Sequence, residues 1–283
     1  MSGQDAAAHW RTVAAQWARL ASPLRPCAED ICIIEEMLAA VPAVLGAAGK
    51  GRAWLLGITS EIAAAPCLQD IDLIAVERVR AMIDAAWPGN TDRRRAICGD
   101  WARAPFADGS FDLAIGDGCL MVAGFPDELS QLLASVHRCL HRDGHLMLRL
   151  FCRPDIAETP DAVIAALLGG EIDSFHAFKW RLGMAVQGID DAPDVAVDAI
   201  WRIWSSAQID ASRLAQERGW PLATVRTMDF YRGSSARYNF MRYDETISHL
   251  QRAGFDLLAT RSGHYELASC CPHVLLRKGR QGS

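Results

Sequence analysis

Glycines and acidic residues follow a series of short apolar runs in the first half of this sequence. If those runs are parallel strands, their carboxyl ends meet at one edge of a sheet, which is where open sheets bind ligands. Glu77 stands 20 residues beyond Gly57, about the spacing at which an acid reaches a nucleotide ribose. The pattern predicts a nucleotide-binding edge formed by Gly57, Thr59, Ser60, Glu61, Glu77, Asp100, Trp101, Asp117 and Gly118.

The apolar runs themselves have the length of buried strands. Five of them lie at 53–58, 71–76, 96–98, 111–115 and 145–151, with segments of helical composition such as 79–86 and 127–141 between them. Strands that alternate with helices indicate a parallel sheet covered on both faces. Two last runs, 255–260 and 273–277, are too close for a helical crossover, so we expect them to pair antiparallel at the sheet edge. The predicted fold is α/β, a doubly wound, mostly parallel, seven-stranded Rossmann-like sheet with an antiparallel last strand.

Two further regions lie outside this alternation. Residues 1–50 are predicted to form an N-terminal helical segment, with apolar residues at helical spacing from Trp10 to Leu20 and from Ile31 to Leu45. Residues 153–245 are rich in helical patterning and aromatic side chains and show no clear strand alternation. We therefore expect a core at 51–152 and 246–283, interrupted by a helical insertion that covers the substrate.

Composition excludes several classes of protein. The 283 residues are 51% hydrophobic and 22% charged, with a net charge of −5, which is ordinary for a globular protein. The acidic balance disfavours a nucleic-acid partner, because such binding depends on clustered Lys and Arg. The start of the chain lacks the pattern of a signal peptide and no apolar stretch is long enough to span a bilayer, so we expect a cytoplasmic protein without a membrane partner.

Nine cysteines are scattered along the chain without a Cys-x-x-Cys pair or matching His spacing. This pattern predicts free thiols and no metal site. For the vicinal pair Cys270-Cys271, the alternative to free structural thiols is redox activity or binding of a soft metal.

The ordered set of strand-end residues resembles the class I S-adenosylmethionine-dependent methyltransferases over about residues 51 to 152 plus the closing hairpin. Gly57-Ile58-Thr59-Ser60-Glu61 is similar to that family's glycine-rich loop, and Glu77 to its ribose-binding acid. Gly99-Asp100-Trp101, followed by Pro105 to Asp112, resembles the segment that holds adenine, and Leu140 to Gly144 resembles the turn before the fifth strand. The resemblance implies S-adenosylmethionine as cofactor and S-adenosylhomocysteine as product.

The glycine-rich loop departs from the family pattern. Leu55 stands in the place of the usual acid, and Thr59 and Glu61 stand in the places of the second and third glycines. Thr59 and Ser60 are good helix N-cap residues whose hydroxyls could bind the methionine carboxylate. Glu61 could hold the ligand's ammonium, and the alternative is an ordinary acid in the first turn of a helix.

Candidate acceptor residues come from the insertion and the final hairpin. Aromatic residues interleaved with Arg and Lys can enclose a planar or anionic small molecule. Phe175, Phe178 and Leu182 are at helical spacing and favour core packing instead. The polar candidates are His176 and Tyr231 as catalytic residues, and Lys179, Arg232, His264 and Tyr265 as substrate contacts.

The resulting hypothesis is an enzyme that methylates a small-molecule metabolite at O, N or S by in-line displacement. Two alternatives remain: a non-catalytic binding or regulatory protein that keeps the fold, motivated by the altered loop, and an RNA methyltransferase. A nicotinamide oxidoreductase is disfavoured because Gly-x-Gly-x-x-Gly is absent.

Overall fold

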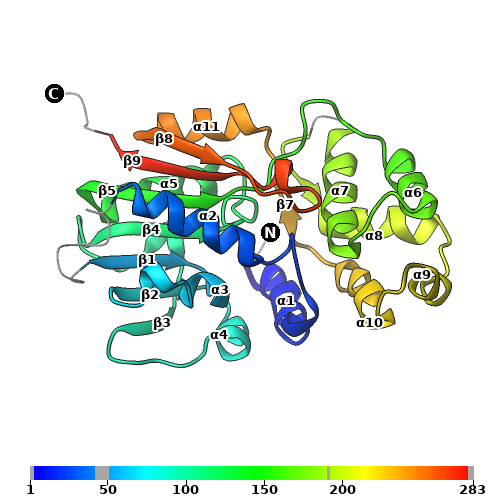
Figure 1. Ribbon diagram of the computed structural model, residues 1–283, viewed down its shortest axis with the longest axis horizontal. Coiled ribbons are helices and arrows are strands. Elements are labelled where there is room, and N and C mark those ends of the chain that lie inside the picture. Colours follow the sequence, from blue (N-terminus) through cyan, green and yellow to red (C-terminus); the bar gives the residue numbers. More distant parts are fainter. Residues whose placement is uncertain (1–2, 42–50, 190–191, 280–283) are drawn as a thin grey trace.

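A seven-stranded sheet with strand order β3-β2-β1-β4-β5-β9-β8 forms the centre of this computed structural model, which describes residues 3–41, 51–189 and 192–279 (Figure 1). The strands are β1 (Arg52–Leu56), β2 (Asp72–Glu77), β3 (Arg94–Cys98), β4 (Phe111–Asp117), β5 (Leu140–Arg149), β8 (Phe255–Arg261) and β9 (His273–Lys278). The first five are parallel, and β9 is antiparallel to both of its neighbours. The predicted mostly parallel sheet with an antiparallel last strand is confirmed. The last strand is internal, however, so β8 forms the edge.

The fifth strand begins earlier than the sequence predicts. Leu140 already pairs with Phe111 of β4, and the register then shifts so that His145 pairs with Leu113. The extra residues of β5 form a bulge, and the expected turn at 140–144 is therefore part of the strand. Gly144 fits this irregularity, because a Cβ there would come within 3.0 Å of the His141 carbonyl oxygen.

Helices cover both faces of the sheet, as the alternation of strands and helices predicts. Leu55, Ile115 and Met147 pack on one face beneath the N-terminal helices, whereas Trp54 and Leu148 pack on the other. The first face carries α1 (Gly3–Ala14), α2 (Ala28–Ala39), α3 (Ser60–Ala63) and α4 (Arg80–Ala86). The second carries α5 (Asp127–Cys139) and α11 (Tyr243–Arg252). Figure 1 shows α2 and α5 on opposite sides of the strands.

The segment between β5 and α11 forms a helical lobe with its own hydrophobic core. Its helices are α6 (Pro160–Gly169), α7 (Phe175–Gly188), α8 (Val197–Ser206), α9 (Ala211–Arg218) and α10 (Leu222–Val225), followed by the 3-10 helix η6 (Arg226–Tyr231). The lobe lies beyond one end of the sheet, and α1 lies between the two (Figure 1). Aromatic residues such as Phe175 and Phe178 form the interior of this lobe.

Two short segments differ from the sequence reading. The insertion contains a two-stranded antiparallel sheet of β6 (Val195–Ala196) and β7 (Arg237–Tyr238), which is too short to produce a detectable alternation. The predicted helix from Ile31 to Leu45 begins at Ala28 as α2 and ends at Ala39, and the part from residue 42 lies outside the described residues. The described residues also form the short 3-10 helices η1 (Trp17–Arg19), η4 (Pro66–Leu68), η5 (Trp101–Arg103) and η7 (Ala268–Cys270).

Candidate functional site

A cavity lies at the carboxyl ends of β1, β2 and β4, between the sheet and the helical lobe. Its sheet end is lined by Leu56, Gly57, Ile58, Thr59, Glu77, Arg78, Val79, Trp101, Asp117, Gly118 and Cys119. Its other end is lined by Trp10, Val13, Trp17, Leu20, Leu24, Met82, Met121, Val122, Phe151, Lys179, Trp180, Phe230, Tyr231 and Tyr238. The cavity thus joins the predicted nucleotide edge to a predominantly aromatic and apolar chamber, which the N-terminal segment and the insertion build together.

The loop after β1 approaches the ends of β2 and β3 closely. Gly57 has a φ of +94°, a conformation that L side chains rarely adopt, and its backbone N–H donates to the Val76 carbonyl at 2.9 Å. A Cβ at this position would lie 3.7 Å from Trp101 and 3.9 Å from Glu77 Oε2. The one glycine that this loop shares with the expected motif therefore stands where the conformation requires it.

Glu77 and Trp101 form the wall opposite that loop. Glu77 Oε1 accepts a hydrogen bond from the Val79 backbone N–H at 2.8 Å, and burial raises the pKa of its carboxyl group. The Trp101 indole N–H donates to the Val76 carbonyl at 2.5 Å, which fixes the ring at the ends of β2 and β3. Glu77 lines the cavity with acceptor capacity remaining, which fits the two donor hydroxyls of a ribose.

Three of the predicted cofactor residues do not line this cavity. Asp100 caps η5 by accepting from the Ala102 N–H at 3.0 Å, and it lies in a neighbouring depression that Trp101 and Arg78 share. Glu61 forms an ion pair with Arg25 at 2.5 Å and accepts a hydrogen bond from the Ser60 hydroxyl at 3.1 Å. The expectation that Glu61 faces a ligand ammonium misses this pairing, because Arg25 comes from the N-terminal segment, 36 positions earlier.

The helix that is expected to begin after Thr59 is short. α3 has four residues, and the Thr59 side chain makes no capping hydrogen bond. Thr59 is buried and lines the cavity, whereas the Ser60 hydroxyl donates to Glu61.

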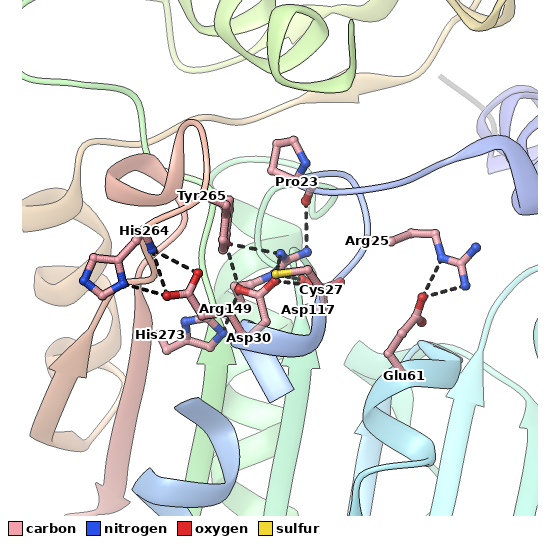
Figure 2. A network of polar contacts seen from close by, with 11 residues as sticks. Pro23, Arg25, Cys27, Asp30, Glu61, Asp117, Arg149, His264, Tyr265 and His273 are labelled. Atoms are coloured by element: carbon pink, nitrogen blue, oxygen red, sulfur yellow. Dashed lines mark hydrogen bonds and ion pairs between the residues drawn. The ribbon is translucent and has the colours of Figure 1, made fainter. Parts of the chain in front are cut away.

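Asp117, at the end of β4, belongs to a buried charge network that sequence reasoning misses. Arg149 on β5 donates to Asp117 at 2.6 Å, to Asp30 of α2 at 2.9 Å and to the Pro23 carbonyl at 3.0 Å (Figure 2). Burial disfavours the guanidinium charge, but the charges of Asp117 and Asp30 outweigh it and hold the pKa of Arg149 above its ordinary value. A buried Arg inside an apolar strand is the sequence signal that such partners must exist.

Asp30 collects further donors from the final hairpin. Tyr265 donates its hydroxyl to Asp30 at 2.7 Å, and the Cys27 backbone N–H donates to the same carboxylate at 2.7 Å. His273 Nε2 lies 3.4 Å from Asp30, but burial lowers the pKa of this imidazole to about 4, which leaves it neutral. The network therefore ties the N-terminal segment to β4, β5 and the hairpin beside the cavity.

At Gly118, the residue after Asp117, the Phe151 ring leaves no room for a side chain. It has a φ of +62°, and a Cβ there would come within 2.3 Å of the Phe151 ring. This close approach sets Phe151, which lines the cavity, directly against the residue that follows β4.

Lys179 and Tyr231 are the predicted acceptor residues that line the cavity. Lys179, on α7, has 2% of its surface exposed, and its ammonium lies 4.3 Å from the centre of the Tyr231 ring. Burial lowers the pKa of Lys179 to about 7 and raises that of Tyr231 well above its usual value. His9 of α1, which was not a candidate, bonds the Tyr238 hydroxyl at 2.9 Å on the same side of the cavity.

The other four acceptor candidates lie away from the cavity lining. His176 Nε2 contacts the Arg19 carbonyl at 3.0 Å, and burial followed by the charge of Lys179 lowers its pKa to about 4. Arg232 lies over the Trp201 ring at 5.2 Å, and His264 contacts Glu29 with its side chain 94% exposed. With Tyr265 in the Asp30 network, all four contact partners from distant segments and lie outside the cavity lining, so their roles toward a substrate stay predictions.

The likeness to known proteins agrees with this geometry. Residues 55–148 match a family model described as a methyltransferase domain. A solved S-adenosylmethionine-dependent methyltransferase from Methanosarcina mazei is 13% identical with a TM-score of 0.52, covering 86% of this chain and 98% of its own. The 1,6-didemethyltoxoflavin-N1-methyltransferase of Burkholderia thailandensis, solved with 1,6-didemethyltoxoflavin and S-adenosylhomocysteine, is 14% identical with a TM-score of 0.52, covering 99% and 92%.

A third solved structure shares the fold under a different description. It is a Rhodobacter sphaeroides protein described as a candidate Zn-dependent alcohol dehydrogenase, 11% identical with a TM-score of 0.61 over the full length of both chains. Among the described residues, no group of three or more His, Cys, Asp or Glu side chains could hold a metal ion. No curated protein matches the chain. Within the described ranges, no helix is long and apolar enough to cross a membrane.

Proposed function

We propose that this chain, a class I S-adenosylmethionine-dependent methyltransferase with its methyltransferase domain at residues 55–148, methylates a small molecule at an O, N or S atom. The observation that carries the proposal is the single cavity that runs from Gly57 and Glu77 to Trp180 and Tyr231. Cofactor and acceptor can meet inside such a space with water displaced from its aromatic walls, as methyl transfer requires.

The residues at the sheet end suit the cofactor. We assign Glu77 to the ribose hydroxyls as a hydrogen-bond acceptor, and Trp101 to the face of the adenine. The Gly57 backbone allows close approach of the ligand, while Thr59, Asp117 and Gly118 line the methionine side of the same space. Asp100, in the adjoining depression, remains our candidate for the adenine amino group, and Ser60 and Glu61 remain candidates for the methionine group through a rearranged loop.

The aromatic end suits a small acceptor. Methyl transfer from a sulfonium is an in-line displacement by an already activated donor, so the protein has mainly to align the acceptor and exclude water. The N-terminal segment and the insertion at 153–245 do this by forming the chamber around Trp17, Phe151 and Trp180. The nine cysteines are free, which fits a reducing compartment, and we assign the enzyme to the cytoplasm on that ground.

Calorimetric binding of S-adenosylhomocysteine to the full chain tests the cofactor assignment. Replacement of Glu77 by Ala is expected to weaken binding by about 1–3 kcal/mol, because it removes hydrogen bonds to a partly buried carboxylate. Asp84→Ala is the matched control, since Asp84 is exposed on α4 and pairs only with Arg80 in the structure. Equal dissociation constants for wild type and Glu77→Ala would remove Glu77 from the site.

Acceptor class is tested by release of S-adenosylhomocysteine with two kinds of substrate. A panel of aromatic small molecules is expected to support turnover, and mixed cellular RNA is expected not to. Turnover with RNA alone would replace the small-molecule acceptor by a nucleic acid, and binding of S-adenosylhomocysteine without turnover on any substrate would favour a binding protein.

A further inference from the structure

Lys179 presents a buried cation to the aromatic end of the cavity. Its Nζ donates to the Thr227 carbonyl at 3.2 Å and to the Thr227 hydroxyl at 3.4 Å. It also lies over the rings of Tyr231, at 4.3 Å, and Phe230, at 5.8 Å. These partners are neutral, and Lys179 lines the cavity together with Phe230 and Tyr231.

Among the side chains that the structure describes, the charge of this ammonium has no counter-ion. Among the side chains that the structure describes, which begin at residue 8, no carboxylate forms an ion pair with Lys179. The titratable groups facing it from α1, α7 and β7 are neutral: burial and the Lys179 charge lower the pKa of His9 and His176 to about 4, and burial raises the pKa of Tyr238. Tyr231, from η6, is a neutral phenol for the same reason.

An uncompensated buried charge is costly, and its cost falls when a ligand supplies the opposite charge in the same space. The rings of Phe230 and Tyr231 lie beside the ammonium, and with Trp180 in the same cavity lining they suit a planar molecule. We infer that the acceptor is an aromatic small molecule with an anionic oxygen, and that this oxygen pairs with the Lys179 ammonium. This inference rests on the proposed function, because it takes the aromatic end of the cavity as the acceptor site.

The anionic oxygen has two chemical sources, a phenolate or enolate and a carboxylate. Matched probes separate them: 4-nitrophenol against nitrobenzene, and benzoate against benzamide, each titrated into the full chain at neutral pH. 4-Nitrophenol also changes colour on ionisation, so its spectrum reports whether the bound form is the anion. Preference for 4-nitrophenolate alone assigns the phenolic class, and preference for benzoate alone assigns the carboxylate class.

Two lysine variants isolate the role of the charge. Lys179→Met keeps an apolar stem of similar length, and Lys278→Met is the matched control, since Lys278 at the end of β9 donates to the Leu140 carbonyl outside this cavity. The wild type and Lys278→Met are expected to bind at least one anion about tenfold or more tightly than its neutral partner, and Lys179→Met is expected to lose that preference, because hydrogen bonds to charged groups are among the stronger ones.

Titrations run with and without S-adenosylhomocysteine separate the two hypotheses. If the wild type binds neither anion better than its neutral partner, or if Lys179→Met keeps the preference, the inference about the acceptor is wrong. Failure to bind S-adenosylhomocysteine is a different outcome, which contradicts the proposed function, and the probe titrations without it still decide the role of Lys179.

Discussion

Two buried cations, Arg149 and Lys179, lie near the same cavity but have different partners. Each has 2% of its surface exposed. Arg149 is bonded to two carboxylates, Asp117 and Asp30, and to a backbone carbonyl. Within the described part of the chain, Lys179 is bonded only to Thr227 and is flanked by aromatic rings.

This difference in charged partners indicates the role of each cation. The charge of Arg149 is satisfied inside the chain, so its role is to fasten the N-terminal segment to β4 and β5 (Figure 2). The charge of Lys179 is satisfied by neutral dipoles alone, so a ligand can still improve its surroundings. The comparison therefore separates Arg149, whose charge is paired inside the chain, from Lys179, for which we propose a ligand-binding role, although both are buried and basic.

The largest expected effect comes from Arg149→Met. This change leaves Asp30 and Asp117 buried without their cation, and removing one partner of a buried ion pair typically costs about 3–5 kcal/mol. We expect the free energy of unfolding, measured by urea denaturation, to fall by about that amount. Arg213→Met, on the exposed face of α9, should stay within about 0.5 kcal/mol of wild type. A similar small change for Arg149→Met would mean that the network does not fasten the segment.

Replacement of Lys179 by Met should raise the free energy of unfolding, whereas replacement of Arg149 by Met should lower it. Burial lowers the pKa of Lys179 from 10.5 to about 7, so the unfolded chain holds this proton more tightly than the folded one. The resulting destabilisation is fully present below pH 7 and disappears as the pH rises from 7 toward 10.5. Lys179→Met is therefore expected to be more stable than wild type by a few kcal/mol at or below pH 7, at about 1.4 kcal/mol per pKa unit.

Urea unfolding of Lys179→Met and wild type across this pH range checks the sign. The gap between them should narrow as pH increases, because the wild type gains stability. A gap that is constant with pH would show that lost packing, rather than the charge, sets the difference.

Tyr265→Phe tests a single member of the Arg149 network and should have a smaller effect. The change removes the hydroxyl that donates to Asp30 at 2.7 Å while keeping the ring. Hydrogen bonds to charged groups contribute about 1.5–3 kcal/mol, and other donors to Asp30 remain, so we expect a loss near the lower end of that range. Thermal unfolding measures it, and no change in melting temperature would remove Tyr265 from the network's energetics.

The smallest effect is expected for Arg25→Ala. Its ion pair with Glu61 is partly exposed, with about a fifth of each side chain accessible, and such pairs contribute about 0.2–1 kcal/mol. The change also removes the partner of the Glu61 carboxylate, which lies at the start of α3, after the loop that follows β1. Weaker or unchanged S-adenosylhomocysteine binding would fit the pairing seen here, whereas clearly tighter binding would show that Arg25 had withheld Glu61 from the ligand.

The sheet and its binding edge could be predicted from the sequence because both follow from local patterns. Apolar runs place the strands, and parallel strands bring Gly57, Glu77 and Asp117 together whatever the rest of the chain does. The start of β5 was missed because a bulge after Leu140 breaks the pattern.

The positions of the remaining site residues depend on contacts that leave no local signal. Asp30 and Arg149 are 119 positions apart, and only the fold shows that they pair. His176, Arg232 and His264 are polar residues near aromatic or charged neighbours in the sequence, but each contacts a partner from a distant part of the chain. Lys179 could be named from its aromatic neighbours, whereas the absence of a carboxylate beside it among the described side chains could be seen only in three dimensions.

A crystal structure with S-adenosylhomocysteine bound tests the central claim most directly, namely that cofactor and acceptor share one cavity. We expect the ribose hydroxyls to donate to Glu77 and the sulfur to face the space lined by Phe151, Tyr231 and Lys179. A ribose bound away from Glu77, or a sulfur facing a wall with no continuous space toward Lys179, would contradict the account.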